Sequence, residues 1–271
     1  MAGQAAISDR FDAFLFDLDG VVYVGEDPLP GAVESLSRLR EAGKQVRFLT
    51  NNPRPTRAQI ARKLAGMGVE AREEEVVSSG RATASYLSDE GIDSAYVIGS
   101  RGLMTEVLGA GVEVVDAGPC EAVVVGADEY VTFAHVRQAV RLIFEGARFV
   151  ATNADASFPT PKGSLPGTGA IVAAVQTTTG REPVVVGKPF PPMFDVALEG
   201  LDRARAVMIG DTPNSDIEGA RRAGIPGVLI SKDGSSAMED NTSPADATIE
   251  DLNGLFDPGV VLRDRYEEVR P

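Results

Sequence analysis

Cysteine, histidine and long apolar runs are scarce in this chain of 271 residues. The single cysteine, Cys120, excludes an internal disulfide and a cysteine-based metal cluster. The single histidine, His135, falls in a stretch with helical spacing, so we expect it to be a structural or surface residue. No apolar run approaches membrane-spanning length, and residues 1–10 lack the pattern of a secretory signal. These absences predict a cytoplasmic protein without a membrane partner.

The charge of the chain is strongly unbalanced. There are 40 acidic and 26 basic residues, which give a net charge of -14 and a pI near 4.6. An acidic surface repels nucleic acid and anionic membranes, so we expect neither as a partner. Only five of the basic residues are lysines. Adaptation to a salty cytoplasm (a halophilic protein) and an ordinary acidic enzyme from a GC-rich genome both explain this composition. The length and the hydrophobic share of 43% predict a folded protein of one or two domains.

Two acids directly follow the first apolar run, residues 13–16. This run is long enough for a strand that is buried on both faces of a parallel sheet. Because strand side chains alternate, Asp17 and Asp19 leave the strand on the same side, and Gly20 lets the backbone turn sharply. Two close carboxylates repel each other unless a cation or a shared proton intervenes, and Mg²⁺ prefers oxygen ligands. A magnesium site and a simple turn with two solvated acids are both consistent with this motif alone.

Strand and helix patterns alternate along the rest of the chain, which predicts a parallel sheet covered by helices. Capping-box patterns at Thr56 with Gln59 and at Ser215 with Glu218 predict two helix starts. Two strand–helix–strand units are expected over residues 95–115 and 122–152. The loop over residues 153–168 is long and rich in Pro and Gly, so we expect it to be functional.

Polar residues stand at four predicted strand ends, and these are Asp17 with Asp19, Thr50 with Asn51, Lys188, and Asp211 with Asp216. In open parallel sheets, ligands bind outside the carboxyl ends of the strands. Each motif is weak by itself. Their order along the chain is the stronger signal.

In this order the motifs resemble those of the haloacid dehalogenase superfamily of phosphohydrolases. The branch is subfamily IIA, which holds the NagD-type and p-nitrophenyl phosphatase-like enzymes. The resemblance extends from residue 14 to about residue 255 and includes Thr50-Asn51-Asn52, Ala151-Thr152-Asn153 with Asp155, Gly187-Lys188-Pro189, and Gly210-Asp211 through Asp216-Ile217. It implies an α/β fold with a Rossmann-like, doubly wound parallel core and an inserted α/β cap of the C2 type. The implied domains are a core over residues 1–78 and 181–271 and a cap over 79–180, through which relatives often form homodimers.

The resemblance also implies a role for each motif residue. Asp17 resembles the nucleophile that forms an aspartyl-phosphate, and Asp19 the acid/base that serves the leaving alcohol and then the attacking water. Thr50, Asn51 and Lys188 are implied to bind the phosphate through a hydroxyl, a backbone amide and an ammonium group. Asp17, Asp211 and the backbone carbonyl of Asp19 are implied to hold Mg²⁺. Asp216 is expected to orient Lys188 or a water on the metal without being a ligand itself.

The implied function is a Mg²⁺-dependent phosphatase that acts on a small phosphorylated metabolite. Asp19 supports this, because the resemblance implies that dehalogenases lack the second acid and that phosphonate-cleaving relatives replace it. Two alternatives remain open: a phosphotransferase or sugar-phosphate mutase on the same fold, and a non-catalytic module that senses phosphate. Candidate substrates are nucleoside monophosphates, glycerol phosphate, phosphoglycolate, pyridoxal phosphate and sugar phosphates. Asn153 and Asp155 are expected to form a turn rather than to bind a ligand.

Overall fold

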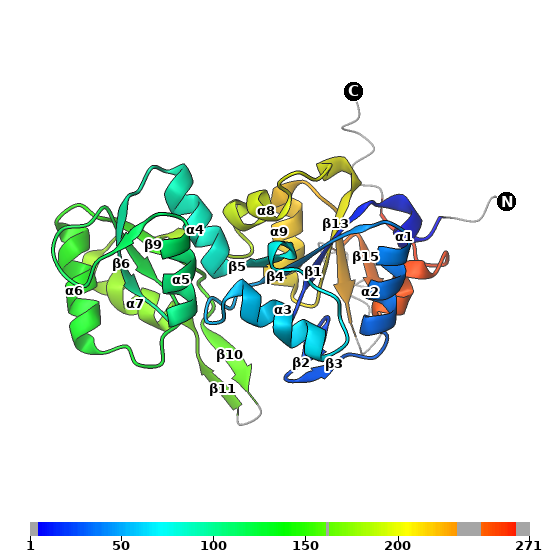
Figure 1. Cartoon of the computed structure of the whole chain (residues 1–271), viewed down its shortest axis with the longest axis horizontal. Coiled ribbons are helices and arrows are strands. Elements are labelled where there is room, and N and C mark those ends of the chain that lie inside the picture. The colour runs from blue at the N-terminus through cyan, green and yellow to red at the C-terminus, as the bar shows by residue number, and fades with distance from the viewer. Residues whose placement is uncertain (1–4, 161–162, 232–244, 264–271) are drawn as a thin grey trace. The chain divides into compact units, whose positions relative to one another are not determined.

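The chain forms two compact units (Figure 1). The computed structural model describes residues 5–160, 163–231 and 245–263. The first unit comprises Met1–Leu49, Ala61–Val76 and Ala197–Pro271, and the second comprises Thr50–Ile60 and Val77–Val196. The predicted cap, residues 79–180, falls inside the second unit, and its exact ends stay a prediction. Among the described residues, no helix has the length and apolar character that crossing a membrane requires.

A parallel sheet with the strand order β15-β14-β13-β1-β4-β5 forms the centre of the first unit. Its strands are β1 (Ala13–Asp17), β4 (Gln45–Thr50), β5 (Val76–Ser78), β13 (Ala206–Gly210), β14 (Gly227–Ile230) and β15 (Ala247–Ile249). The other elements of this unit are α1 (Ile7–Arg10), β2 (Tyr23–Val24), β3 (Asp27–Pro28), α2 (Ala32–Glu41), α9 (Glu218–Ala223), the 3₁₀ turns η1 (Glu73–Glu75), η2 (Arg203–Arg205) and η4 (Leu252–Phe256), and the π-helical turn η3 (Pro213–Ile217). Strands β4 and β5 and helices α3 (Arg57–Gly66) and α8 (Pro191–Ala197) include residues of both units.

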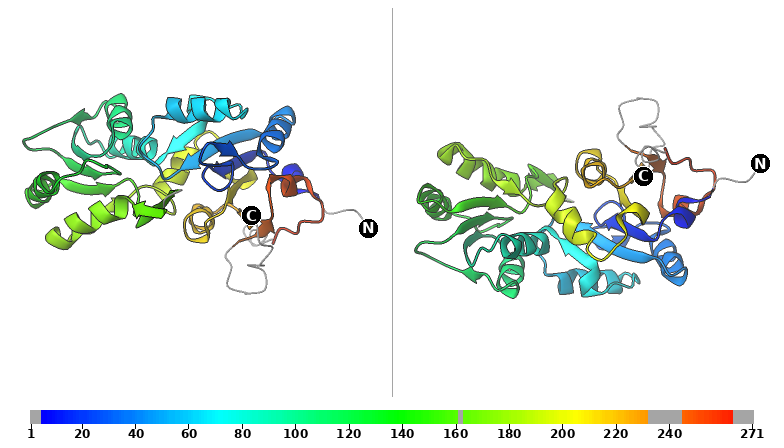
Figure 2. Two further views of the ribbon diagram at one scale, coloured as in Figure 1. Left: turned by 90° about the horizontal axis from the view of Figure 1, so that it is seen from below. Right: turned by 90° about the horizontal axis from the view of Figure 1, so that it is seen from above.

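The strand order of this sheet creates a switch point between β1 and β13. Counted along the chain, the order is 6-5-4-1-2-3, so the connections from the two central strands lead in opposite directions. Every residue of β1 and β13 is buried, which fits strands covered on both faces by helices such as α2 and α9 (Figure 2). In such sheets the crevice at the switch point is the expected ligand site. This confirms the predicted Rossmann-like, doubly wound core.

A second parallel sheet, with the order β12-β9-β8-β6-β7, forms the centre of the second unit. Its elements are α4 (Ser79–Asp89), β6 (Ser94–Ile98), α5 (Arg101–Gly109), β7 (Glu113–Val114), β8 (Ala122–Val125), α6 (Phe133–Phe144), β9 (Arg148–Ala151), the hairpin β10 (Ser157–Thr160) and β11 (Gly163–Pro166), α7 (Thr168–Thr179) and β12 (Val184–Val185). Helices α4 and α5 lie on one face and α6 and α7 on the other (Figure 2). This separate sheet is the predicted inserted α/β cap.

One of the two predicted capping boxes is present, and the other is wrong. The side-chain oxygen of Gln59 accepts a hydrogen bond from the Thr56 backbone N–H at 2.9 Å, and Thr56 Oγ1 accepts one from the Gln59 N–H at 3.2 Å. Ser215 instead lies inside η3, and the carboxylate of Glu218 pairs with Arg221 and Arg222. Because Arg221 and Arg222 lie one turn further along α9, the Glu218 carboxylate pairs with them instead of accepting a hydrogen bond from the Ser215 backbone N–H. The predicted loop over residues 153–168 also contains the β10–β11 hairpin.

A buried carboxylate next to β5 makes the stability of the protein sensitive to acid. The side chain of Glu75 is 1% exposed; its burial raises the pKa, but hydrogen bonds from Arg40 and Arg72 outweigh this and hold it at about 2. Because the pKa is lowered in the folded state, the stabilisation is complete above the unfolded pKa and is lost as pH falls toward about 2.

We therefore expect Glu75→Gln to lower the free energy of unfolding at pH 7 by about 3 kcal/mol. Urea unfolding at a series of pH values measures this, and the difference between the variant and the wild type should shrink below pH ~4. Glu74→Gln is the matched control, because its side chain is 67% exposed and should change little. Equal losses in both variants would contradict the assignment.

Candidate active site

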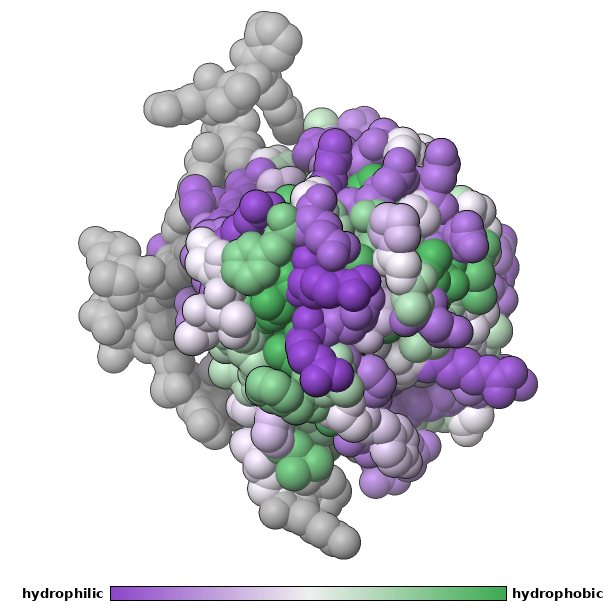
Figure 3. Space-filling model, turned by 90° about the vertical axis from the view of Figure 1, so that its left-hand side faces the viewer, coloured by the Kyte–Doolittle hydropathy of each residue, from purple (hydrophilic) through white to green (hydrophobic). Residues whose placement is uncertain are grey.

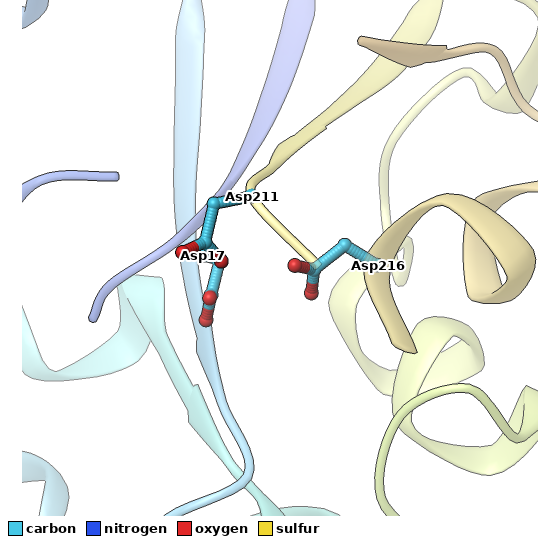
Figure 4. Close-up of side chains that lie close together, drawn as sticks. All are labelled: Asp17, Asp211 and Asp216. Atoms are coloured by element: carbon cyan, nitrogen blue, oxygen red, sulfur yellow. The ribbon is translucent and has the colours of Figure 1, made fainter. Parts of the chain in front are cut away.

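Three carboxylates meet at the switch point of the first sheet (Figure 4). Asp17 ends β1, Asp211 directly follows β13, and Asp216 lies in η3. One oxygen of each lies within 4.8 Å of one oxygen of each of the others. The Asp17 side chain is buried, and Asp216 is completely inaccessible. The structure thus brings together three of the four acids that the sequence predicts for this unit.

Two glycines make room for the acid cluster. Gly20 has φ +88°, and a Cβ there would lie 2.0 Å from Asp211 Oδ2. A Cβ at Gly210 would lie 2.2 Å from the Cβ of Asp216. Any larger residue at either position would displace a carboxylate of the cluster. The close approach therefore depends on glycine at both positions.

Hydrogen bonds fix the two acids that come from the loop after β13. Asp216 Oδ2 accepts a hydrogen bond from the Thr212 backbone N–H at 3.0 Å, and Asp211 Oδ1 accepts one from Thr212 Oγ1 at 3.1 Å. The π-helical turn from Pro213 to Ile217 carries Asp216 back toward the strand end. One threonine therefore orients two carboxylates. Sequence reasoning did not identify this role of Thr212.

Asp19, the fourth acid, lies outside this carboxylate cluster. Its side chain is exposed, and its backbone forms an isolated bridge with Tyr23. Burial raises the pKa of the Tyr23 phenol, and the negative charges of Asp19 and Asp17 raise it further. The ammonium nitrogen of Lys63 lies 4.0 Å from the centroid of the Tyr23 ring. The region around the acids therefore carries a negative field that favours a cation.

The remaining predicted site residues form a second group, inside the second unit. Asn51 Oδ1 accepts a hydrogen bond from the Lys188 backbone N–H at 2.8 Å, and Asn51 Nδ2 donates to the Lys188 carbonyl at 3.1 Å. Lys188 is 4% exposed, and Thr50, also buried, accepts a hydrogen bond at Oγ1 from the Asn52 backbone N–H. The Asn51 amide therefore holds the backbone of Lys188 on both sides.

The loop after β9 fixes the position of Asn51 through hydrogen bonds from Asn153 and to Asp155. Asn153 Nδ2 donates to the backbone carbonyl of Asn51 at 2.7 Å, and Asn153 Oδ1 accepts from the Asp155 N–H at 3.1 Å. Asn51 Nδ2 also donates to Asp155 Oδ2 at 3.1 Å. A Cβ at Gly187 would lie 2.7 Å from Asn51 Oδ1, so this packing needs glycine there. The turn predicted for Asn153 and Asp155 is present, and it also anchors the residue that holds Lys188.

The resemblance implies that Lys188 binds phosphate, and on this prediction Asn51→Ala should lower kcat/KM for a phosphate ester by about 10- to 100-fold, because two hydrogen bonds of about 1 kcal/mol each are lost from the Lys188 backbone. Steady-state kinetics and the inhibition constant of inorganic phosphate measure the effect. Asn51→Asp keeps the acceptor for the Lys188 N–H but places a carboxylate oxygen against the Lys188 carbonyl and the Asp155 carboxylate, so its kcat/KM should be at least as low as that of Asn51→Ala. If the inhibition constant of inorganic phosphate is the same in Asn51→Ala as in the wild type, Asn51 does not position Lys188 for phosphate binding.

A doubly wound core with an acidic centre at its switch point, together with an inserted α/β cap, defines a class: capped, Rossmann-like enzymes with an aspartate cluster. The sequence pattern described as "Haloacid dehalogenase-like hydrolase" matches residues 14–113, and that described as "HAD-hyrolase-like" matches residues 185–255. The chain belongs to the haloacid dehalogenase superfamily, subfamily IIA, as predicted.

Similar proteins cover most of the chain. An acid sugar phosphatase of Staphylococcus haemolyticus is 38% identical over 82% of this chain and 85% of its own length. The glycerol phosphate phosphatase of Mycobacterium tuberculosis, solved in complex with magnesium, is 31% identical with a TM-score of 0.87, over 96% of this chain and 80% of its own. A p-nitrophenyl phosphatase from Archaeoglobus fulgidus is 32% identical with a TM-score of 0.84, over 91% of this chain and 98% of its own. The likeness therefore includes both units.

Proposed function

We propose that this protein is a Mg²⁺-dependent phosphatase that hydrolyses small phosphomonoesters. The observation that carries the proposal is the carboxylate cluster of Asp17, Asp211 and Asp216 at the switch point of a haloacid dehalogenase core. The similar proteins support it, because the relatives from Staphylococcus haemolyticus, Mycobacterium tuberculosis and Archaeoglobus fulgidus are phosphatases and the second was solved with magnesium. They favour sugar phosphates and glycerol phosphate among the candidate substrates. They give no support to salt adaptation as the reason for the acidic composition.

The acid cluster fits a magnesium ion. Oxygen ligands on opposite sides of Mg²⁺ stand about 4 Å apart, and the three carboxylates offer oxygens within 4.8 Å of one another. Asp17 and Asp211, with the backbone carbonyl of Asp19, would hold the ion, and Asp216 is close enough to take part. When bound, the ion neutralises the charge of the carboxylates and of the phosphate oxygens.

The proposed chemistry proceeds through a covalent phosphate on Asp17. The Asp17 carboxylate attacks phosphorus, and the bond to the leaving oxygen breaks while Asp19 gives that oxygen a proton. Asp19, now ionised, takes a proton from the water that attacks the aspartyl-phosphate, which releases inorganic phosphate and restores both acids. Thr50, the Asn51 backbone amide and Lys188 bind the phosphate oxygens in this proposal. Most of the rate acceleration then comes from positioning and charge neutralisation.

A screen for phosphate release tests the proposal. Purified protein should release phosphate from members of a panel of sugar, glycerol and nucleoside monophosphates with Mg²⁺, and should stop when the metal is chelated. Mg²⁺ should also raise the melting temperature of the wild type but not of Asp211→Asn, which gives a readout independent of turnover. Absence of release from every ester would contradict the phosphatase. Faster transfer to an added alcohol than to water would favour the phosphotransferase or mutase, and magnesium-dependent phosphate binding without turnover would favour a sensing module.

The proposal includes a homodimer formed through the second unit. Side chains of Tyr130, Phe133 and Phe144 are 84%, 83% and 58% exposed there, the last two at the ends of α6. Figure 3 shows apolar groups gathered between hydrophilic ones on one face of the molecule. Exposed aromatic side chains are typical of interfaces. Light scattering should give a dimer for the wild type and a monomer for Phe133→Ser, and a monomeric wild type would exclude pairing.

The predicted cytoplasmic location is also part of the proposal, and cell fractionation tests it.

A further inference from the structure

A short hairpin follows the acids Asp17 and Asp19 in the first unit. Strands β2 and β3 have two residues each, and Tyr23 of β2 pairs with Pro28 of β3. An isolated two-stranded hairpin is at best marginally stable in water, and this one is unusually short. It therefore needs contacts with the rest of the first unit to keep one position.

The backbone of this hairpin is hydrogen-bonded to the segment that carries Asp19. Asp19 and Tyr23 form an isolated bridge, and the Gly20 N–H donates a hydrogen bond to the Tyr23 carbonyl at 2.8 Å. The Tyr23 N–H donates to the Leu18 carbonyl at 3.2 Å. In the proposed reaction, Asp19 gives the leaving oxygen its proton. A displacement of Tyr23 would therefore also displace the proposed proton donor.

Lys63 of helix α3 contacts the Tyr23 ring. Tyr23 is 5% exposed, and the Lys63 ammonium nitrogen lies 4.0 Å from the ring centroid. Lys63 belongs to the part of α3 that lies in the first unit, together with Tyr23 and Asp19 (Figure 1). The quadrupole of an aromatic ring attracts a cation over its face, and it does so more strongly where water is partly excluded. The Lys63 side chain is 30% exposed, so this contact is partly shielded from water.

Lys63 also forms an ion pair, but this pair contributes less. A carboxylate oxygen of Glu26, in the turn between β2 and β3, lies 3.5 Å from Lys63 Nζ. The Glu26 side chain is 87% exposed, and an ion pair with a solvated group of this kind is worth little. The contact between Lys63 and the Tyr23 ring is therefore the stronger of the two.

We propose that Lys63 is a positioning residue of the active site: its contact with the Tyr23 ring fixes the β2–β3 hairpin, and the hairpin fixes Asp19 for proton transfer. Lys63 itself acts through Tyr23 and does not touch the substrate. The proposal rests on the proposed phosphatase function and adds a residue that lies outside every sequence motif of the site. It predicts a less stable hairpin backbone and a selective loss of hydrolysis when Lys63 is replaced.

Amide hydrogen exchange, measured by NMR, tests the contact without any substrate. Lys63→Met keeps the apolar stem and removes the charge, so we expect the Gly20 and Tyr23 amides to exchange about fivefold faster than in the wild type. The Gly227 amide, which donates to Asp246 Oδ2 in the same unit, is the internal reference and should be unchanged. Equal exchange rates of the Gly20 and Tyr23 amides in the variant and the wild type would overturn the proposal.

Kinetics at saturating Mg²⁺ test the consequence for Asp19. Lys63→Met should lower kcat for glycerol 3-phosphate by about five- to tenfold and leave kcat for p-nitrophenyl phosphate within about twofold, because only the alkoxide needs the proton. Lys63→Arg keeps a cation over the ring and should restore most of the loss. A contact that merely stabilises the fold predicts equal losses on the two esters, so an equal loss, or no loss on either, would contradict the positioning role.

Two further variants separate the ring contact from the ion pair. Glu26→Gln removes only the exposed ion pair, so kcat for both esters should stay within about twofold of the wild type. Tyr23→Leu removes the ring, and the double variant with Lys63→Met should lose no more activity than Tyr23→Leu alone, because Lys63 then has no ring to act through. Additive losses in the double variant would mean that Lys63 does not act through Tyr23.

The exchange experiment separates a failed contact from a failed phosphatase. If the wild type hydrolyses no ester, the proposed function fails and the role in proton transfer fails with it, whereas faster amide exchange in Lys63→Met still supports the contact that fixes the hairpin. If the wild type is active and amide exchange is the same in both proteins, the phosphatase stands and the role of Lys63 is overturned.

Discussion

Asp17→Asn is expected to abolish phosphate release while the protein stays folded. An amide is a poor nucleophile and a poor ligand for Mg²⁺, so the variant loses the attacking group and weakens the metal site together. We expect kcat to fall by about 10⁴-fold or more, comparable to the loss of a nucleophile in other covalent enzymes. Release of p-nitrophenol from p-nitrophenyl phosphate measures the loss over a wide range.

The acid cluster makes the folding outcome of this substitution predictable. One oxygen of Asp17 lies within 4.8 Å of one oxygen of Asp211 and of one oxygen of Asp216, so Asp17→Asn removes one of three close carboxylates while it keeps the size and shape of the side chain. The melting temperature without Mg²⁺ should therefore stay close to that of the wild type. Asp9→Asn, at an exposed acid of the same unit, is the control and should keep full activity. Normal turnover in Asp17→Asn would refute its role as the nucleophile.

Sequence patterns predict the acid centre well, because it depends on local features. A short apolar run ending in Asp17 and another ending before Asp211 each mark a strand end, and parallel strands place their carboxyl ends at one edge. What the patterns do not contain is the turn that returns Asp216 to the cluster. That turn depends on the π-helical geometry of η3 and on the hydrogen bond from the Thr212 N–H to Asp216. The periodicity of the sequence predicts neither feature.

The second unit illustrates why the remaining features are hard to predict. The β10–β11 hairpin has four residues in each strand, and the Pro and Gly of this stretch look like a loop. Its register depends on cross-strand pairing, which single-sequence periodicity does not detect. A cavity of about 510 Å³ in the second unit draws its wall from Arg54, from the turn after β8 and from α7, segments far apart along the chain. Only the tertiary fold brings such pieces together.

The role of Asn51 shows a different limit. Residue type and position predict a polar contact near the phosphate, and the backbone amide can still make it. In the structure, the Asn51 side chain forms hydrogen bonds with the backbone of Lys188 and with the Asp155 carboxylate. An amide offers both a donor and an acceptor, so sequence alone cannot distinguish a ligand contact from a structural one. The same ambiguity does not arise for Asp17, since a buried carboxylate needs a cation or a proton.

Asp19→Asn is expected to slow hydrolysis of alkyl phosphates by about 10²- to 10⁴-fold and that of p-nitrophenyl phosphate far less. An alkoxide needs a proton as it leaves, whereas p-nitrophenolate is stable enough to leave without one.

The side chain of Asp19 is exposed and lies outside the carboxylate cluster of Asp17, Asp211 and Asp216, so its loss should spare the metal site. The midpoint of Mg²⁺ activation should therefore stay close to that of the wild type, which separates Asp19 from Asp211, whose replacement should shift it. Parallel measurement of kcat for glycerol 3-phosphate and p-nitrophenyl phosphate decides the assignment: an equal loss on both esters means that Asp19 does not donate the proton, and a selective loss on the alkyl ester means that it does.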